Sequence, residues 1–192
     1  MENKTPFMSE IPEKEPQRQQ YFMAHAKEQL HILEENLGRP LTCCINTFGC
    51  QMNARDSEKL LGILETIGYQ AVETEDADFV LYNTCTVREN ANLRVYGRLG
   101  QLGARKKKHP HMMIALCGCM MQEKEVVEKI KKTYRFVDLI FGTHNIFKLA
   151  ELVSLCLEER LEELEAQGRE DKKPKHKMVV DVWKDTDQIV ED

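Results

Sequence analysis

Three cysteines recur at nearly equal intervals and stand in equivalent sequence contexts. Cys50, Cys85 and Cys119 follow one another at intervals of 35 and 34 residues, and each lies between an apolar, strand-like run and a helical pattern. A thiol at the start of a helix has a lowered pKa because the backbone amides and the helix dipole favour its negative form. All three cysteines are therefore candidates for binding a metal as thiolates.

The arrangement of the thiols narrows the kind of metal site. A structural zinc site normally takes two cysteines from a short C-x-x-C hairpin, and the chain contains no such motif. Cubane iron-sulfur clusters usually take four cysteines, so three well-separated thiolates would leave one iron without a protein ligand. Such an iron can bind a substrate or an external sulfur species. This pattern indicates a catalytic or donor cluster rather than a simple electron carrier.

The other cysteines have simpler interpretations. Cys43 and Cys44 lie inside the first expected strand, where a buried free cysteine packs as a small hydrophobic residue. Cys156 lies in the last expected helix and is interpreted as a structural or surface residue. Cys117 forms C-G-C with Cys119 and could chelate beside it, but Cys119, like the first of the three cysteines, directly follows a glycine. We therefore expect Cys117 to be the last packed residue of its strand.

Motifs for other chemistries are weak or missing from the sequence. The 6 histidines show no ligand spacing with the cysteines, and only His144, near the start of the last expected helix, merits attention. The run GRLGQLG lies inside a helical pattern and does not match the dinucleotide-binding fingerprint. No P-loop, nucleophile-elbow or H-E-x-x-H motif occurs. A flavodoxin-like nucleotide-binding module remains an alternative on fold grounds alone.

Parallel strands are needed to bring the three cysteines together. Strands alternate with helices along residues 41–167, which predicts right-handed βαβ crossovers and a parallel sheet covered on both faces. The expected strands are 41–47, 69–72, 79–83, 112–116 and 137–141, and the expected helices are 54–68, 88–107, 123–132 and one that begins near residue 144. The fold class is thus α/β, a three-layer sandwich with a mainly parallel sheet. The cysteines would lie on βα loops at the carboxyl edge, where such sheets bind ligands.

Outside this core the chain changes character. Residues 1–16 carry three prolines and many charges, which predicts a disordered N-terminal tail. Residues 17–40 are expected to form a helix on the outside of the domain, because apolar residues recur at helical spacing and Gly38 can end the helix. Residues 168–192, which include the run KKPKHK and an acidic end, are interpreted as a linker toward a further domain.

Composition restricts the functional classes. With 192 residues the chain is about one domain with tails, and its 42% hydrophobic content suffices for a core. The formal charge of −5 argues against a protein that binds nucleic acid mainly by its own bulk charge. Basic runs at 105–108, 129–132 and 172–177 are interpreted as solvated helix ends or linker rather than an RNA-binding surface.

Cysteine usage and hydropathy predict the cellular compartment. No apolar stretch approaches the roughly 18 residues of a membrane span, and the N-terminus does not resemble a secretory signal. The 7 cysteines, an odd number, are therefore expected to be mostly reduced thiols in a cytoplasmic protein. In that compartment metal binding or redox chemistry is favoured over a disulfide framework.

Three motifs around these cysteines resemble those of one family. NTFGCQMNARDSE around Cys50, NTCTVRENA around Cys85 and CGCMMQ around Cys119 are similar to the N-terminal domain of the methylthiotransferase family, over roughly residues 41–165. FGCQMN with DSE, and NTC followed by VRENA, resemble the branch that acts on isopentenyladenosine in tRNA. The chain departs from the family pattern at Cys117, where a small residue such as glycine is expected, and at Met121, where alanine is common.

The resemblance implies a set of cofactors and a reaction. Members of this family hold an auxiliary 4Fe-4S cluster on three cysteines, matched here by Cys50, Cys85 and Cys119. A second 4Fe-4S cluster, in a following radical S-adenosylmethionine domain, cleaves S-adenosylmethionine to an adenosyl radical. That radical removes hydrogen from C2 of N6-isopentenyladenosine next to the anticodon. Sulfur carried at the auxiliary cluster is methylated by a second cofactor molecule and delivered to that carbon.

The resemblance also implies the partners. The radical domain binds its cluster through a CxxxCxxC motif, which this chain does not contain. We therefore expect the radical domain and the C-terminal RNA-binding domain to be absent here, and activity and most tRNA affinity with them. The expected partners are tRNA and those two domains of the same polypeptide, without a membrane. The alternatives are a structural zinc or redox-thiol domain and the flavodoxin-like nucleotide-binding module.

Overall fold

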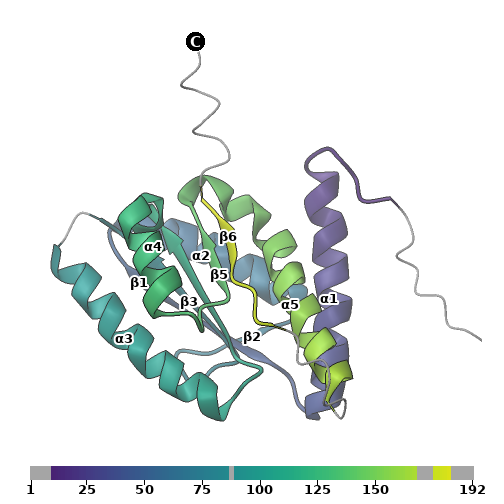
Figure 1. Ribbon diagram of the computed structural model, residues 1–192. Helices are drawn as coiled ribbons and strands as arrows, with labels where there is room; N and C mark the ends of the chain where they lie inside the picture. The colour runs from purple at the N-terminus through teal and green to yellow at the C-terminus, as the bar shows by residue number, and fades with distance from the viewer. Residues whose placement is uncertain (1–9, 87–88, 168–174, 183–192) are drawn as a thin grey trace, which may run out of the picture.

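Six parallel strands form the middle layer of the molecule, in the order β2-β1-β3-β4-β5-β6 (Figure 1). The computed structural model describes residues 10–86, 89–167 and 175–182. The strands are β1 (Thr42–Phe48), β2 (Gln70–Ala71), β3 (Phe79–Thr84), β4 (Met113–Gly118), β5 (Leu139–Phe141) and β6 (Val179–Asp181). The predicted parallel α/β sandwich is confirmed, and every described pair of neighbouring strands is parallel.

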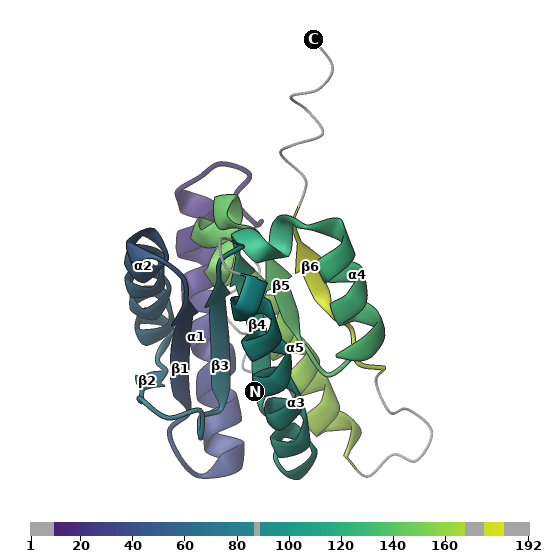
Figure 2. The ribbon, with the colours of Figure 1, turned by 90° about the vertical axis from the view of Figure 1, so that its left-hand side faces the viewer.

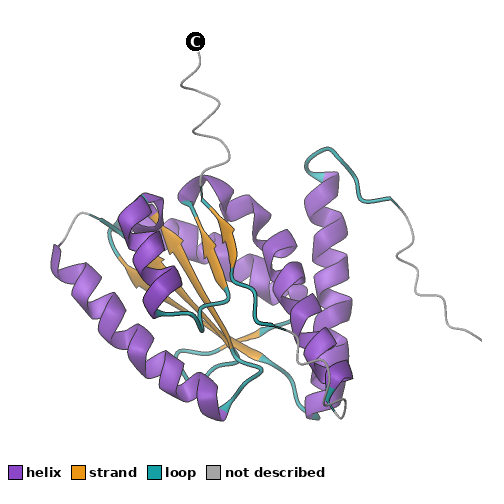
Figure 3. Ribbon diagram, in the orientation of Figure 1, coloured by secondary structure: helices purple, strands orange, loops and turns teal. Residues whose placement is uncertain are grey.

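Helices cover both faces of this sheet (Figures 1 and 2). The longer helices are α1 (Gln17–Leu37), α2 (Gln51–Ile67), α3 (Glu89–Lys108), α4 (Lys124–Thr133) and α5 (Leu149–Ala166). One face carries α1, α2 and α5, and the other carries α3 and α4. Short 3-10 helices, η1 (Cys119–Gln122) and η2 (Thr143–Lys148), directly follow β4 and β5. Figure 3 shows how helices surround the strands on both sides.

The two central strands explain why the chain folds as a covered parallel sheet. All residues of β3 and β4 are buried, as expected for strands that helices cover on both faces. Their side chains alternate between two hydrophobic cores. In β3, Leu81 packs with α1, α2 and α5, whereas Val80 and Tyr82 pack with α3 and α4. The continuous apolar runs in the sequence therefore correspond to strands with two buried faces.

Helix α1 confirms the expectation of a covering helix ahead of the core. It packs against α5 and α2, and its buried side chains Phe22, Ala26, Leu30 and Leu33 belong to the core on that face of the sheet. Gly38 ends it with a positive φ of 72°, a conformation that glycine adopts without a steric penalty. Arg18 of α1 also forms an ion pair with Glu151 of α5.

Two aspartates hold the amino ends of the strands together. Asp78 directly precedes β3, and its carboxylate accepts the backbone N–H of Thr42 in β1 at 2.9 Å. Asp138 directly precedes β5, and its carboxylate accepts the backbone N–H of Ile114 in β4 at 2.8 Å. Each carboxylate therefore links its own strand to a neighbour at the edge opposite the cysteine loops.

The structure differs from the sequence predictions near the C-terminal end. Residues 179–181, inside the range expected to be a linker, form β6 and pair in parallel with β5. The last helix was expected to begin near His144, but η2 occupies 143–148 and α5 starts at Leu149. The expected disordered tail and linker also include residues 1–9, 168–174 and 183–192, which lie outside the described residues. No helix in the described part of the chain is both long and apolar enough to cross a bilayer.

Candidate functional site

Three adjacent strands deliver the three predicted cysteines to the same edge of the sheet. Cys50 follows β1, Cys85 follows β3 and Cys119 follows β4, and these strands are neighbours in the sheet. Phe48 pairs with Thr84, and Thr84 pairs with Gly118, so the strands end level with one another. Each cysteine therefore lies within two residues of this common end. The predicted placement on βα loops at the carboxyl edge is confirmed.

The loop of Cys85 lies between the other two loops and contacts both of them. Its side chain hydrogen bonds with that of Cys50. The next residue, Thr86, donates its backbone N–H to the Cys119 sulfur at 3.3 Å. Cys85 is buried, Cys119 is partly buried and Cys50 is exposed. The exposure of the three thiols thus increases from Cys85 through Cys119 to Cys50. An external ligand could reach them from the Cys50 side.

Cys50 is the N-cap residue of α2. Its sulfur accepts the Asn53 backbone N–H, and the Asn53 side chain accepts the Cys50 backbone N–H, which together form a capping box. The backbone N–H groups of Asn53 and Met52 stabilise the negative sulfur and lower the pKa of the Cys50 thiol below its usual range. The predicted effect of a helix start on this thiol is confirmed.

Two glycines allow the loops to approach one another. A Cβ at Gly49 would lie 2.5 Å from Asn53 Oδ1 and 2.9 Å from Cys85 Cβ. A Cβ at Gly118 would lie 2.0 Å from the Thr84 carbonyl oxygen, and Gly118 has a φ of +102°. Real Cβ atoms essentially never come this close, so both positions require glycine. The glycine before Cys50 and the glycine before Cys119 thus both allow neighbouring loops to pack closely.

Two asparagines between the loops were missed by the sequence analysis. Asn53 and Asn83 are 6% and 1% exposed, and their side-chain amides hydrogen bond to each other at 3.2 Å. The available signals were the C-x-x-N spacing, which fits a capping box, and an asparagine at the end of a strand just before Thr84 and Cys85. Buried polar side chains of this kind are hydrogen-bonded for a structural or functional reason.

The remaining cysteines are buried, in accordance with their interpretation as packing residues. Cys43 and Cys44 point to opposite faces of the sheet and belong to different cores. Burial raises the pKa of Cys43 to about 12 and raises the pKa of Cys44 and Cys156 as well. Cys117 is fully buried in β4, and burial raises the pKa of its thiol well above the usual range. Cys117 therefore behaves as a core residue in this structure.

A group of three potential ligands lies elsewhere, at the opposite edge. Among the described residues, ligating atoms of Asp138, Glu159 and His176 lie within 4.8 Å of one another, whereas the three cysteine sulfurs are not such a group. Lys106 and Arg160 bind the Asp138 carboxylate at 2.7 and 2.6 Å. Because two cations already neutralise this carboxylate, the group is a salt-bridge network rather than a metal site.

Comparisons with known proteins agree with this geometry. A sequence model for the family described as uncharacterized protein family UPF0004 matches residues 42–142, just over half of the chain. The match covers all three cysteines and the strands that carry them. The chain belongs to the UPF0004 family. This family is the N-terminal domain of the methylthiotransferases, so the resemblance inferred from the motifs is confirmed.

Curated relatives of this UPF0004 domain are much longer proteins. A protein from Lachnoclostridium phytofermentans, named tRNA-2-methylthio-N(6)-dimethylallyladenosine synthase, is 63% identical over 170 residues, which are 88% of this chain and 34% of the relative. Proteins of the same name from Acetivibrio thermocellus and Clostridioides difficile are 46% and 43% identical over 94% of this chain and 35% of their own length. The chain thus spans about a third of the length of these relatives.

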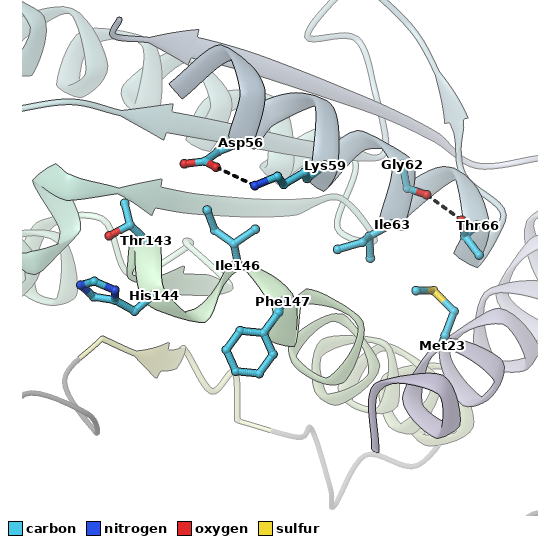
Figure 4. Close-up of a pocket in the computed structure, with 10 residues that line it drawn as sticks. All are labelled: Met23, Asp56, Lys59, Gly62, Ile63, Thr66, Thr143, His144, Ile146 and Phe147. Carbon is cyan, nitrogen blue, oxygen red and sulfur yellow. Dashed lines mark hydrogen bonds and ion pairs between the residues drawn. The ribbon is translucent and has the colours of Figure 1, made fainter. Parts of the chain in front are cut away.

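A shallow groove lies on the face of the UPF0004 domain that carries α1 and α2. It has a volume of about 710 Å³ and lies between α2, η2 and α1 (Figure 4). Its walls include Lys59 and Ile63 of α2 and His144 and Phe147 of η2. His144, the histidine noted in the sequence, therefore lines this groove, and the three cysteines are not among its lining residues.

The basic runs within the described part of the UPF0004 domain lie at helix ends, as predicted. Arg105 and Lys106, in the last turn of α3, form ion pairs with Asp76 and Asp138. Lys131, near the end of α4, pairs with Glu128. In a βαβ crossover the helix runs back from the carboxyl edge, so these runs lie at the edge opposite the cysteines.

Proposed function

We propose that this UPF0004 domain holds an auxiliary 4Fe-4S cluster on Cys50, Cys85 and Cys119 in a longer tRNA methylthiotransferase. The longer protein would add a methylthio group to C2 of N6-isopentenyladenosine next to the anticodon, in the cytoplasm. The observation that carries the proposal is the arrival of three thiols, from three consecutive strands, at one level edge of the sheet. The shared name of relatives up to 63% identical, tRNA-2-methylthio-N(6)-dimethylallyladenosine synthase, supports the choice of reaction.

The donor set fits such a cluster. Thiolates are the usual protein ligands of iron-sulfur clusters. The cysteine nearest to these loops in sequence, Cys117, is fully buried in β4. Three ligands leave one iron open, and an open iron at the exposed Cys50 side could bind the sulfur species that is transferred. The cluster would supply that sulfur chemistry. The protein residues would hold the cluster, and the backbone N–H groups of Met52, Asn53 and Thr86 would stabilise charge on the sulfurs.

A structural zinc ion fits the same residues less well. The ligands of tetrahedral zinc, each about 2.3 Å from the metal, lie about 4 Å from one another. The three sulfurs do not all lie within 4.8 Å of one another. A cubane cluster binds each thiolate to a different iron, so it spaces its ligands more widely. The three sulfurs as a group are therefore not spaced for a single zinc ion that all three would share.

The reaction as a whole needs the remaining two thirds of the longer protein. The second cluster, the two S-adenosylmethionine molecules and the contacts that hold tRNA would come from the radical and RNA-binding domains. We expect this chain to bind the auxiliary cluster without those domains, because the three proposed ligands and the loops that carry them all lie within it.

Anaerobic reconstitution with iron and sulfide tests the cluster proposal. The purified chain should take up about four irons, the content of a cubane cluster, and develop the broad visible absorption of an iron-sulfur protein. Alanine in place of Cys50, Cys85 or Cys119 should abolish this uptake. Cys44→Ala, in a buried cysteine outside the loops, is the matched control and should retain it.

Other outcomes of the same experiment would contradict the proposal. Zinc that copurifies at one ion per chain, without cluster absorption, would support the structural zinc domain. Saturable binding of flavin or nucleotide by a chain in which all three cysteines are replaced would support the nucleotide-binding module. Full iron uptake by any one of the three single cysteine variants would remove that residue from the ligand set.

A further inference from the structure

A pair of buried side-chain amides joins the loops that carry the cysteines. Asn53 lies in the first turn of α2, and Asn83 lies near the end of β3. Asn53 Nδ2 donates to Asn83 Oδ1 at 3.2 Å. The two side chains are 6% and 1% exposed, so water competes little for these hydrogen bonds.

Asn53 connects the Cys50 loop to the Cys85 loop. Its Oδ1 accepts the Cys50 backbone N–H at 3.3 Å and lies 3.3 Å from the Cys50 sulfur. Its Nδ2 donates to the carbonyl oxygen of Thr84, the residue before Cys85, at 3.2 Å. One amide thus holds the N-cap of α2 against the end of β3.

Asn83 secures the same junction from the other side. Its Nδ2 donates to the Asn53 backbone carbonyl at 2.8 Å and to Ser57 Oγ at 3.0 Å. Ser57 Oγ in turn hydrogen bonds with Thr47 Oγ1 of β1 at 2.7 Å. The first two turns of α2 are therefore tied to both strands that precede Cys50 and Cys85.

The third loop is packed against the same pair. Thr84 Oγ1 donates to the carbonyl oxygen of Cys117 at 2.7 Å. A Cβ at Gly118, directly before Cys119, would lie 2.9 Å from Asn83 Oδ1. Because Gly118 has no side chain, the loop of Cys119 packs directly against the Asn83 amide. All three loops therefore meet around Asn53 and Asn83.

We propose that Asn53 and Asn83 are positioning residues for the auxiliary cluster, which fix the separation of the Cys50 and Cys85 thiols. This inference rests on the proposed function. Asn53 acts through the cysteines, because it hydrogen bonds to the backbone of Cys50 and of Thr84, the residue before Cys85. Asn83 acts through Asn53, which it holds by two hydrogen bonds. Residues that orient metal ligands in this way commonly change metal affinity by about 10- to 100-fold when they are replaced.

The rate at which a ferrous chelator removes iron from the reconstituted chain tests this inference. Asn53→Ala removes the contacts to Cys50, Thr84 and Asn83 together, so it should lose iron about 10- to 100-fold faster than the wild type. Asn83→Ala should show the same direction of change. The visible absorption of the cluster, recorded during release, provides a readout that does not depend on enzymatic activity.

Asn145→Ala is the matched control for loss of a buried amide. Asn145 is 2% exposed, lies in η2 after β5 and donates to the Asp181 carbonyl at 2.8 Å rather than to a cysteine loop. It should lower the free energy of unfolding of the metal-free chain, as Asn53→Ala does, yet release iron at the wild-type rate. A role of Asn53 in folding alone predicts equal release rates in the two variants and would overturn the inference.

Asn53→Asp keeps the shape of the side chain and separates the two halves of the contact. Its carboxylate still accepts the Cys50 N–H, but it cannot donate to Asn83 or Thr84. It should therefore release iron faster than the wild type, and it carries the test if Asn53→Ala does not fold by circular dichroism. Wild-type release by a folded Asn53→Asp chain would count against the inference, whereas a wild-type chain without iron would count against the proposed function itself.

Discussion

At the scale of single residues, glycines and asparagines shape the edge that the cysteines occupy. The cysteines supply sulfur, but the backbone of each loop must come within van der Waals contact of the next before the thiols can share a ligand. Gly49 lies against Asn53 and Cys85, and Gly118 lies against Thr84 and Asn83. The residues that allow the loops to pack together therefore lie in or beside the same loops as the thiols.

Gly118→Ala should strongly destabilise the protein. The added Cβ would lie 2.0 Å from a backbone oxygen that cannot move without its strand, at a φ of +102° that alanine rarely adopts. We expect the free energy of unfolding to fall by about 3 kcal/mol or more, measured by urea denaturation of the metal-free chain.

Gly100→Ala is the control for this substitution. Gly100 lies inside α3, and a Cβ there meets no atom within 4 Å. Alanine should stabilise this helix by about 0.5–1 kcal/mol. A Gly118→Ala chain as stable as the wild type would show that β3 and β4 can separate at their carboxyl ends, contrary to the packing described here.

The sequence predicted the residues with distinctive chemistry and missed those with ordinary chemistry. The placement of Cys50, Cys85 and Cys119 at one edge of the sheet could be predicted because the thiols recur at nearly equal intervals after apolar runs. Asn53 and Asn83 could not, because asparagine before a helix or after a strand usually reports local turn and cap preferences. Their joint burial depends on the register of β1 and β3, which sequence periodicity does not determine.

At the scale of elements, carboxylates lock the strand starts at the edge opposite the thiols. Burial raises the pKa of Asp78, but hydrogen bonds from Arg39, His111 and the Thr42 backbone outweigh it and hold the pKa well below its usual range. Asp138 plays the same part for β4 and β5, with Lys106 and Arg160 as its cations. The sheet is thus fastened at one edge by charge and at the other by close packing.

Asp78 should make the stability of the chain depend on pH. Its folded pKa lies below the value of about 3.9 of an unfolded aspartate, so its contribution is complete above about pH 5 and is lost as the pH falls toward the folded pKa. Asp78→Asn should lower the free energy of unfolding by about 2 kcal/mol at pH 7 and by about 1 kcal/mol less at pH 3, where the unfolded aspartate is already largely protonated. Urea denaturation at both pH values measures the difference.

The exposed pair Lys131 and Glu128 provides the control for the pH experiment. Its charges lie 3.1 Å apart with both side chains in solvent, where such pairs contribute little to stability. Glu128→Gln should therefore leave the unfolding curve unchanged at either pH. An Asp78→Asn effect of equal size at pH 7 and pH 3 would show that the carboxylate charge does not matter.

Long periodic segments were predicted well, and short irregular ones were not. The apolar pattern of α1 gave its bounds, and the alternation of strands and helices gave the parallel sheet. β6 was missed because three residues after a lysine-rich run carry no periodic signal. η2 was read as the start of α5 because a 3-10 turn and an α-helix share similar composition. Both errors lie where tertiary contacts, such as those of Asn145 with Asp181, decide the structure.

At the scale of the whole molecule, the distribution of charge argues against a role as an independent RNA-binding module. The formal net charge is −5. At the ends of α3 and α4, Arg105, Lys106 and Lys131 are paired with acids, and these helix ends lie away from the cysteine edge. Phosphate contacts by free cations provide most of the affinity for nucleic acid, so the rest of the longer protein would have to supply them.

The chain by itself should therefore bind tRNA weakly. We expect fluorescence anisotropy with labelled, unmodified tRNA at 150 mM salt to give a dissociation constant of about 10⁻⁴ M, the weak end of non-specific binding. A double Lys107→Glu, Lys108→Glu chain should bind equally weakly, because the end of α3 would not face the RNA. A submicromolar constant that this variant abolishes would instead identify that helix end as an RNA-binding surface.

The three thiols come from three separate βα units, so the strands must pair before the thiols can come together. The three cysteines are 35 and 34 residues apart in the chain, so no short peptide carries two of the three proposed ligands, unlike a hairpin ligand pair. The proposed cluster could be bound only once β1, β3 and β4 lie side by side. Under that proposal the cluster would have to enter a folded domain, and a mutation that delays strand pairing would lower the iron content without altering a ligand.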